Sequence, residues 1–298
     1  MRRPVPFGGI RLQWQEWSDV LVLAVALFCS MGFRQAYAQD SVSSSVIDRI
    51  RESGTLTVAV FAEDVVPFFY VDDDGRLIGI DPSLAEDIAK NLGVEVRYNR
   101  SASTFDGVID EVAEGRADVA ISLLSDTLER ATRVDFTDPY VSVRQFLLIN
   151  RLELGKLLAD NQDQPIAELL NDASSRIGVI GGTSYVNFAD QYFPEAQKVE
   201  YEAWDAMLGD LKAQSLVALM YDEIEIGNWR LADPAGALDL RPFHLEGRPD
   251  TIAIATRRGD GDLKDWLNLY LRRIEEDGSL VLLLDRYLYT SERALGDE

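Results

Sequence analysis

Hydrophobic residues between positions 50 and 290 follow two periods in turn, the two-residue period of a strand and the three-to-four-residue spacing of a helix. Residues 55–61 alternate and are rich in β-branched side chains, which predicts a strand. Leu84, Ile88 and Leu92 then recur at helical spacing, and Gly93 ends the helix. Because strands and helices keep alternating in this way, the pattern predicts an α/β fold with mostly parallel sheets.

The same pattern continues along the rest of the chain and predicts two series of strands and helices, the second starting near residue 177. An Asp74-Gly75 pair predicts a hairpin turn before the first helix. The other expected strands are 94–98, 118–122, 145–149, 177–180, 198–201, 216–220 and 252–255, and the other expected helices are 105–115, 150–173, 184–193, 203–213, 263–274 and 279–289. Two such series joined by extended strands predict two lobes with a cleft between them.

The first 38 residues carry the pattern of an export signal. Arginines precede an apolar run over 20–33, and at about 14 residues this run is shorter than the ~20 needed to span a bilayer. A cleavage pattern of the form A-x-A ends at Ala38. We therefore expect a signal peptide over residues 1–38, cut after Ala38, and a periplasmic mature protein. If the segment is not cut, it would anchor the protein to the membrane.

The charge of the chain excludes some partners. The whole sequence has a formal net charge of −22, and removing residues 1–38 leaves 25 basic and 49 acidic residues, a net charge of −24. Nucleic acids and anionic membranes bind basic surfaces, so neither is expected as a partner. The chain has one cysteine, Cys29, within the expected signal peptide, and one histidine, His244, in a segment that reads as a loop. Common zinc sites need several cysteine and histidine ligands, and the chain has too few of both. We therefore expect no metal and no cofactor.

The densest cluster of polar chemistry lies in residues 125–140. Ser125, Thr127 and Arg130 stand within six residues, and an arginine offers a planar fork of donors that matches the two oxygens of a carboxylate. The alternative is a helix start capped by Thr127, with Arg130 on a solvated face. Ser125 and Asp222 each follow an expected strand, and Thr183 opens an expected helix. Since ligands of open α/β sheets bind at the carboxyl ends of strands, these side chains should face one cleft.

Seven segments in this order, together with Asp222, resemble the bacterial extracellular solute-binding proteins of family 3, the polar amino-acid binders of ABC transporters. The segments are 54–60, 67–70, 74–81, 84–93, 115–119, 125–140 and 178–183. The resemblance implies a bilobal periplasmic-binding-protein-like fold of type II, with two βα lobes joined by a two-strand hinge. Lobe 1 would comprise 50–146 plus 251–298 and lobe 2 would comprise 147–250, after an N-terminal linker over 39–49.

The resemblance also implies roles for individual residues. Arg130, helped by Ser125, would pair with the α-carboxylate of the ligand, and Asp222 would receive its α-ammonium. Thr183 would add its hydroxyl and amide from a helix start, with Ser184 assisting. Both ligand charges would be satisfied only when the two lobes meet, because an unpaired buried charge is costly. Ligand would then favour the closed state.

Some positions stay open. Phe68 and Phe105 match aromatic positions that flank the ligand in the family, and core packing is an equally good explanation of each. Arg144 stands where the family often has a small residue, so it either reads an acidic ligand side chain or pairs with a protein acid. Asp135 and Asp138 are expected to organise their turn.

The resulting expectation is a monomeric binding protein, not an enzyme, that captures a polar amino acid and delivers it to the permease of an ABC importer. One alternative is a dehydratase on the same scaffold, similar to cyclohexadienyl dehydratase, which needs a proton donor in the cleft. Glu202, Glu223 and Glu225 are the candidates for that donor. Another alternative is a membrane-tethered module that senses ligand for a partner.

Overall fold

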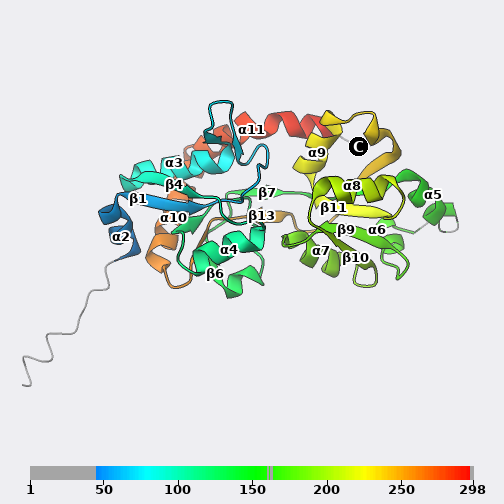
Figure 1. The fold of residues 1–298 in the computed structure, drawn as a ribbon, viewed down its shortest axis with the longest axis horizontal. Coiled ribbons are helices and arrows are strands. Elements are labelled where there is room, and N and C mark those ends of the chain that lie inside the picture. The colour runs from blue at the N-terminus through cyan, green and yellow to red at the C-terminus, as the bar shows by residue number, and fades with distance from the viewer. Residues whose placement is uncertain (1–44, 160, 162–163, 296–298) are drawn as a thin grey trace, which may run out of the picture. The chain divides into compact units, whose positions relative to one another are not determined.

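The computed structural model describes residues 45–159, 161 and 164–295, and residues 45–298 group into one compact unit. The expected signal peptide and Cys29 lie outside the described residues. The described chain builds two five-stranded sheets with their helices, which form two lobes (Figure 1). Within the described residues the first helix, α2 (Val46–Ser53), begins inside the segment expected to be a linker.

The first lobe is built on a five-stranded sheet, of order β4-β1-β5-β14-β6. The pairings of β1 with β4 and β5 are parallel, and those of β14 with β5 and β6 are antiparallel. Its strands are β1 (Thr55–Ala59), β4 (Glu95–Asn99), β5 (Val119–Ala120), β6 (Val134–Phe136) and β14 (Ala255–Arg257), and a hairpin adds β2 (Tyr70–Val71) and β3 (Leu77–Ile78). The helices of this lobe are α2, α3 (Ile80–Leu92), α4 (Phe105–Ala113), the 3-10 helix η1 (Arg130–Thr132) and α10 (Gly261–Glu276). The last helix of the described chain, α11 (Ser279–Leu295), contacts α3 and α10 of this lobe and also α9 (Glu223–Ala232) of the other.

The second lobe is built on another five-stranded sheet, of order β10-β9-β11-β8-β12. Its strands are β8 (Gln145–Asn150), β9 (Arg176–Ile180), β10 (Gln197–Tyr201), β11 (Ala218–Asp222) and β12 (Leu240–His244). Its helices are α5 (Arg151–Ala159), α6 (Ile166–Leu170), α7 (Ser184–Tyr192), α8 (Trp204–Lys212), α9 (Glu223–Ala232) and the 3-10 helix η2 (Gly236–Asp239). Strand β8 is buried on both faces, with Phe146 and Leu148 in one apolar cluster and Leu147 and Ile149 in another. Helices therefore cover both sides of this sheet.

Two short strands join the lobes (Figure 1). Strand β7 (Val141–Val143) leads from the first sheet into β8, and β13 (Asp250–Ile252) leads back from β12 to β14. They pair with each other antiparallel, with Asp250 opposite Val143. The predicted two-strand hinge is confirmed as part of a bilobal α/β fold.

Several expectations about the elements were wrong. The sheets are mixed, since each has two parallel and two antiparallel pairings. The helix expected over 150–173 is broken after Ala159 and restarts after Pro165, whose fixed backbone suits a helix start. The strand expected over 252–255 is two strands in two sheets, β13 and β14. His244 ends strand β12 beside the Phe146 ring, so its segment is not a loop.

Candidate functional site

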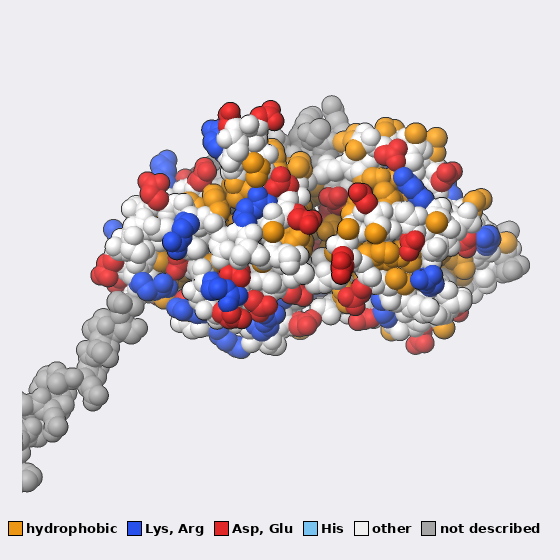
Figure 2. All heavy atoms as spheres, viewed as in Figure 1, with side chains coloured by type: hydrophobic (Ala, Val, Ile, Leu, Met, Phe, Trp, Pro, Cys, Tyr) orange, Lys and Arg blue, Asp and Glu red, His pale blue; other side chains and the backbone are white. Residues whose placement is uncertain are grey.

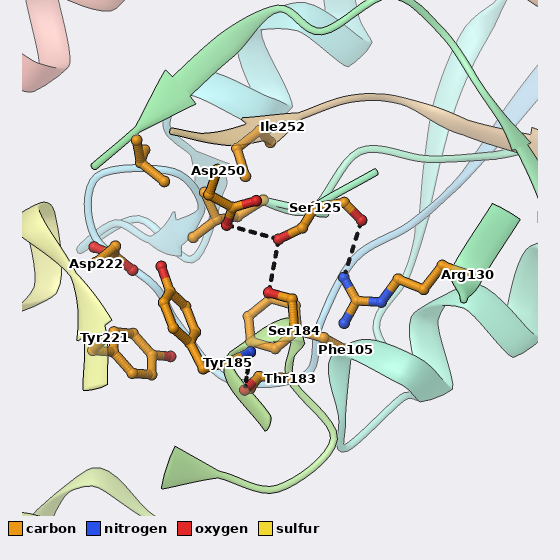
Figure 3. A pocket seen from close by; sticks show the side chains of 12 residues that line it. Phe105, Ser125, Arg130, Thr183, Ser184, Tyr185, Tyr221, Asp222, Asp250 and Ile252 are labelled. Atoms are coloured by element: carbon orange, nitrogen blue, oxygen red, sulfur yellow. Dashed lines mark hydrogen bonds between the residues drawn. The ribbon is translucent and has the colours of Figure 1, made fainter. Parts of the chain in front are cut away.

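A pocket at the hinge gathers most of the predicted site residues (Figure 3). Six of the seven predicted residues line it, from both lobes: Arg130, Ser125, Phe105, Thr183, Ser184 and Asp222. The other lining residues are Leu123, Val143, Tyr185, Tyr221, Asp250 and Ile252. The seventh predicted residue, Phe68, is buried in the apolar core of the first lobe, where it packs and does not line the pocket.

Arg130 reaches the pocket from the start of η1 and is only 4% exposed. Its backbone N–H donates to the Thr127 hydroxyl at 3.2 Å, so Thr127 does cap this turn, but the alternative of a solvated Arg130 is wrong. The guanidinium Nε donates to Asp106 Oδ1 at 3.0 Å, and Nη1 donates to the Ser125 carbonyl at 3.3 Å. Nη2 lies 3.0 Å from the same Asp106 oxygen but makes no aligned hydrogen bond within the described residues. The Nη2 atom of Arg130 therefore retains hydrogen-bond donor capacity.

The loop that carries Ser125 is held from beneath by a buried carboxylate. Asp81, in the first turn of α3, accepts hydrogen bonds from the Leu123 backbone N–H at 2.8 Å and from the Tyr140 hydroxyl at 2.7 Å. Leu123 has a φ of 48°, a backbone conformation that residues other than glycine rarely adopt. Burial raises the pKa of Asp81 to about 7. Asp81 thus positions the loop without lining the pocket.

The second lobe contributes a helix start. Thr183 caps α7, since its hydroxyl accepts from the Tyr185 N–H at 3.3 Å and donates to the Ile180 carbonyl at 2.6 Å. That hydroxyl is therefore already engaged, and the cap brings the next two side chains to the pocket. The Ser184 Oγ lies 2.8 Å from the Ser125 Oγ of the first lobe.

Asp222 occupies the junction of β11 and α9, where it is 4% exposed. One of its oxygens, Oδ1, accepts from the backbone N–H groups of Ile224 at 2.9 Å and Glu225 at 2.8 Å. A carboxylate at a helix N-terminus is favoured both by these bonds and by the helix dipole. Burial still dominates and raises the pKa of Asp222 to about 6. Asp222 is therefore not a surface acid, because its side chain is buried against the pocket.

Asp250 is the most informative lining residue that sequence reasoning missed. It starts the hinge strand β13, is 4% exposed and accepts a 2.8 Å hydrogen bond from the Ser125 hydroxyl. Burial raises its pKa to about 7, and repulsion from Asp222 adds to the effect. In the sequence it is a lone acid between Pro249 and an apolar segment, which is too weak a signal to mark a site.

Aromatic side chains form the walls. Phe105 lines the pocket from the first turn of α4, capped by Thr104, and its ring stacks on Phe61 at 4.7 Å. Tyr185 and Tyr221 also line the pocket, and their rings stack at 4.8 Å. Sequence patterns gave these tyrosines no role, because an aromatic residue in a helix or a strand is equally typical of a core.

The contacts of the charged residues decide the role of Arg144 and reduce the number of candidate proton donors. Arg144 Nε lies 2.6 Å from Glu223 Oε2, so Arg144 pairs with a protein acid beside the hinge and does not line the pocket. Glu202 is exposed on the second lobe. Glu225 is largely buried in the first turn of α9, and burial raises its pKa to about 7.

The lobes meet around the pocket. The Asp106 N–H donates to the Gly182 carbonyl at 3.2 Å, and the Asn228 amide donates to the Val66 carbonyl at 2.8 Å. Gly182 has a φ of 71°, and a Cβ built there would lie 2.9 Å from the Thr104 Cβ across the cleft. Figure 2 shows acidic side chains around the hollow between the lobes. This arrangement is a closed one.

Among the described residues, no cluster of His, Cys, Asp and Glu has the arrangement of a metal site. No helix in the described part of the chain combines the length and the apolar character that crossing a bilayer requires.

Residues 46–290 match the model of the bacterial extracellular solute-binding proteins, family 3. The chain belongs to this family. The predicted resemblance is thereby confirmed, and the family's match extends over both lobes and the hinge.

Relatives in the family bind different amino acids. The L-cystine-binding protein TcyJ of Escherichia coli K12 is 26% identical over 89% of this chain and 92% of its own length. The histidine-binding periplasmic protein of the same strain is 25% identical over 74% of this chain and 83% of its own length. The solved structure of the ancestral amino acid-binding protein AncCDT-1, described as a precursor of cyclohexadienyl dehydratase, is similar with a TM-score of 0.66 and 28% identity, covering 82% of this chain and 99% of its own.

Proposed function

We propose that this protein captures a small zwitterionic ligand, an α-amino acid, by closing its lobes and delivers it to the permease of an ABC importer. The observation that carries the proposal is that Arg130, from the first lobe, and Asp222, from the second, line one pocket. The α-carboxylate would meet Arg130, and the α-ammonium would meet Asp222. Charge-assisted hydrogen bonds are worth roughly 1.5–3 kcal/mol each, so four or five of them, less the cost of ordering, give affinities of about micromolar.

Further parts of the proposal concern organisation and location. The lobes are proposed as 50–146 plus 251–298 and 147–250, with the linker over 39–49. The protein is proposed to be a periplasmic monomer whose signal peptide is cut after Ala38. The periplasmic relatives support the compartment. N-terminal sequencing of exported protein tests the cleavage, and a start at Met1 would contradict it.

Titration calorimetry against the twenty amino acids and common derivatives tests the binding function. Heat of binding at micromolar concentrations is expected for one or a few α-amino acids. A folded protein that gives no heat with any of them would contradict the proposal. Ser125, Ser184, Thr183 and Phe105 are proposed as further ligand contacts, on the basis of their places in the pocket.

A dehydratase is the second candidate, and one observation favours it. Asp222, Asp250 and Glu225 all have pKa values raised to about 6 or 7, which suits a general acid at neutral pH. The likeness to a precursor of cyclohexadienyl dehydratase points the same way. Of the proton donors considered from sequence, Glu223 is held by Arg144 and Glu202 is exposed, which leaves Glu225. Incubation with prephenate or arogenate tests this function, and absence of product contradicts it.

A further inference from the structure

The wall of the pocket opposite Arg130 carries more acidic chemistry than one ammonium requires. Asp222 approaches from the end of β11 and Asp250 from the start of β13. Figure 3 shows the Tyr185 side chain directed with its hydroxyl toward these two carboxylates. Tyr185 is 5% exposed, and its hydroxyl has no hydrogen-bond partner within the described residues. This wall therefore offers a ligand two carboxylates and one hydroxyl that can both donate and accept a hydrogen bond.

Neither carboxylate is neutralised by a protein cation. Asp222 is bonded only by two backbone N–H groups and Asp250 only by the Ser125 hydroxyl, and both lack an ion pair within the described part of the chain. Arg130 attracts Asp250 at longer range without forming an ion pair with it. Two buried carboxylates that face the same pocket repel each other. Keeping both charged costs free energy unless one of them binds a proton or a cation binds between them.

The charges of the ligand can be counted against this wall. A zwitterion with a neutral side chain brings one cation for two carboxylates, since its own carboxylate takes up Arg130. One of the acids would then stay uncompensated or protonated. A ligand with a second cationic group would compensate both, and the Tyr185 hydroxyl could accept a hydrogen bond from it.

We infer that Asp250, assisted by the Tyr185 hydroxyl, is a second cation-binding point that selects α-amino acids with a positively charged side chain. This inference rests on the proposed function, because it takes Arg130 and Asp222 as the partners of the zwitterion. It assigns a specificity role to the hinge strand β13, at a position that also bonds the Ser125 loop. Asp250 would therefore contact the ligand from a position that its hydrogen bond with Ser125 fixes.

The experiment compares ligands that differ only in charge. Calorimetry at neutral pH pairs ornithine with its isostere norleucine and 2,4-diaminobutyrate with its isostere norvaline. The wild-type protein is expected to bind the charged member of at least one pair about tenfold or more tightly than its isostere, and tenfold corresponds to about 1.4 kcal/mol. Asp250→Asn keeps an oxygen that can accept from Ser125, so the fold should persist while the preference falls to about threefold or less.

Two further variants sharpen the result. Tyr185→Phe removes only the hydroxyl and should weaken the charged ligand several-fold while leaving the isostere unchanged. Asp190→Asn is the matched control, because Asp190 is a half-exposed acid on α7 that pairs with Lys198 and does not line this pocket. It should keep the wild-type preference. Loss of the preference in Asp190→Asn as well would assign it to general charge and overturn the inference.

The other outcomes are separable. If the wild-type protein binds both members of each pair equally and Asp250→Asn changes nothing, the inference fails while the proposed function stands. If neutral amino acids bind with uptake of a proton, the two acids share one ammonium, and the inference again fails alone. If no α-amino acid of any charge binds to folded protein, both the proposed function and this inference are contradicted.

Discussion

The Oγ atoms of Ser125 and Ser184 lie 2.8 Å apart, although the two residues belong to different lobes. Ser125 follows the last strand before the Arg130 turn, and Ser184 is the first residue of α7. The contact therefore exists only when the lobes are closed around the pocket. The distance between these two oxygens therefore reports whether the two halves of the site are in contact.

Ser184→Ala removes one side of this contact without disturbing the helix cap, which Thr183 provides. A neutral hydrogen bond contributes about 0.5–1.5 kcal/mol, so ligand affinity should fall about 3–10-fold. The stability of the free protein should change little. Calorimetry and thermal unfolding together check this, and an unchanged affinity would show that the hydroxyl pair is irrelevant to closure.

Gly182→Ala should oppose closure, because the added Cβ would lie 2.9 Å from the Thr104 Cβ in the other lobe. The change also carries a backbone cost, since Gly182 has a φ of 71°. We expect both a loss of stability on the order of 1 kcal/mol and a loss of ligand affinity of about tenfold or more.

Gly93→Ala is the matched control for that variant. Gly93 has a φ of 77° but no heavy atom within 4 Å of a built Cβ. It should show the same loss of stability with no change in affinity. Equal affinities in the two variants, measured by calorimetry, would contradict the interlobe clash.

Asp81 should be essential to the Ser125 loop even though it does not line the pocket. Asp81→Ala leaves the Leu123 N–H and the Tyr140 hydroxyl without their partner, so it should destabilise the protein by about 2–4 kcal/mol and weaken ligand binding. Asp81→Asn can still accept from Leu123 and pair with Tyr140, so its free energy of unfolding should stay within about 1 kcal/mol of wild type. Denaturant unfolding of both variants decides this. Equal losses in the two would show that the side chain does not act through these hydrogen bonds.

Asp250 should make stability depend on pH in a definite direction. Its pKa is about 7 in the folded protein, above the ~3.9 of an unfolded aspartate. As the pH rises from about 4 to about 7, the unfolded chain loses this proton first, so the group lowers the free energy of unfolding across that window and no further above it. The charged groups facing Asp250 are Asp222, Asp126 and Arg130, and the two acids act in the same direction.

Asp250→Asn cannot titrate, which isolates the effect. It should raise the free energy of unfolding at about pH 8 by on the order of 1–3 kcal/mol and have a smaller effect at about pH 4.5. Chemical unfolding at both pH values measures the difference. A variant that is equally destabilised at both would mean that Asp250 is charged and satisfied in the free protein.

The sequence was most informative where one residue type is required by local chemistry. Ser125 and Arg130 in the turn at 125–130, Thr183 at a predicted helix start and Asp222 after a predicted strand all reach the pocket, whereas the helix α9 that begins after Asp222 was not predicted. Sequence reasoning failed where the outcome depends on pairing across the fold. Asp250 is defined by its place opposite Val143 in a two-stranded hinge, and no local pattern contains that information.

The same limit explains the errors in the sheets. Strand β8 alone runs antiparallel to its neighbours β11 and β12 in the second sheet, because it enters this lobe directly from the hinge strand β7. Periodicity predicts a strand but not its direction. Phe68 shows a related limit, because an aromatic residue in a family motif is equally typical of a ligand contact and of a core residue. In the structure it is buried in the core of the first lobe.

The central claim is that Arg130 holds the ligand's carboxylate while Asp222 holds its ammonium. The most direct measurement is calorimetry of the best amino-acid ligand, its methyl ester and its N-acetyl derivative with wild type, Arg130→Met and Asp222→Asn. The account predicts that wild type binds the ester and the N-acetyl derivative about 100-fold or more weakly than the parent, since each loses a buried charge pair. Arg130→Met should lose only the discrimination against the ester, and Asp222→Asn only the discrimination against the N-acetyl derivative. Variants that keep both discriminations at the wild-type level would contradict the account.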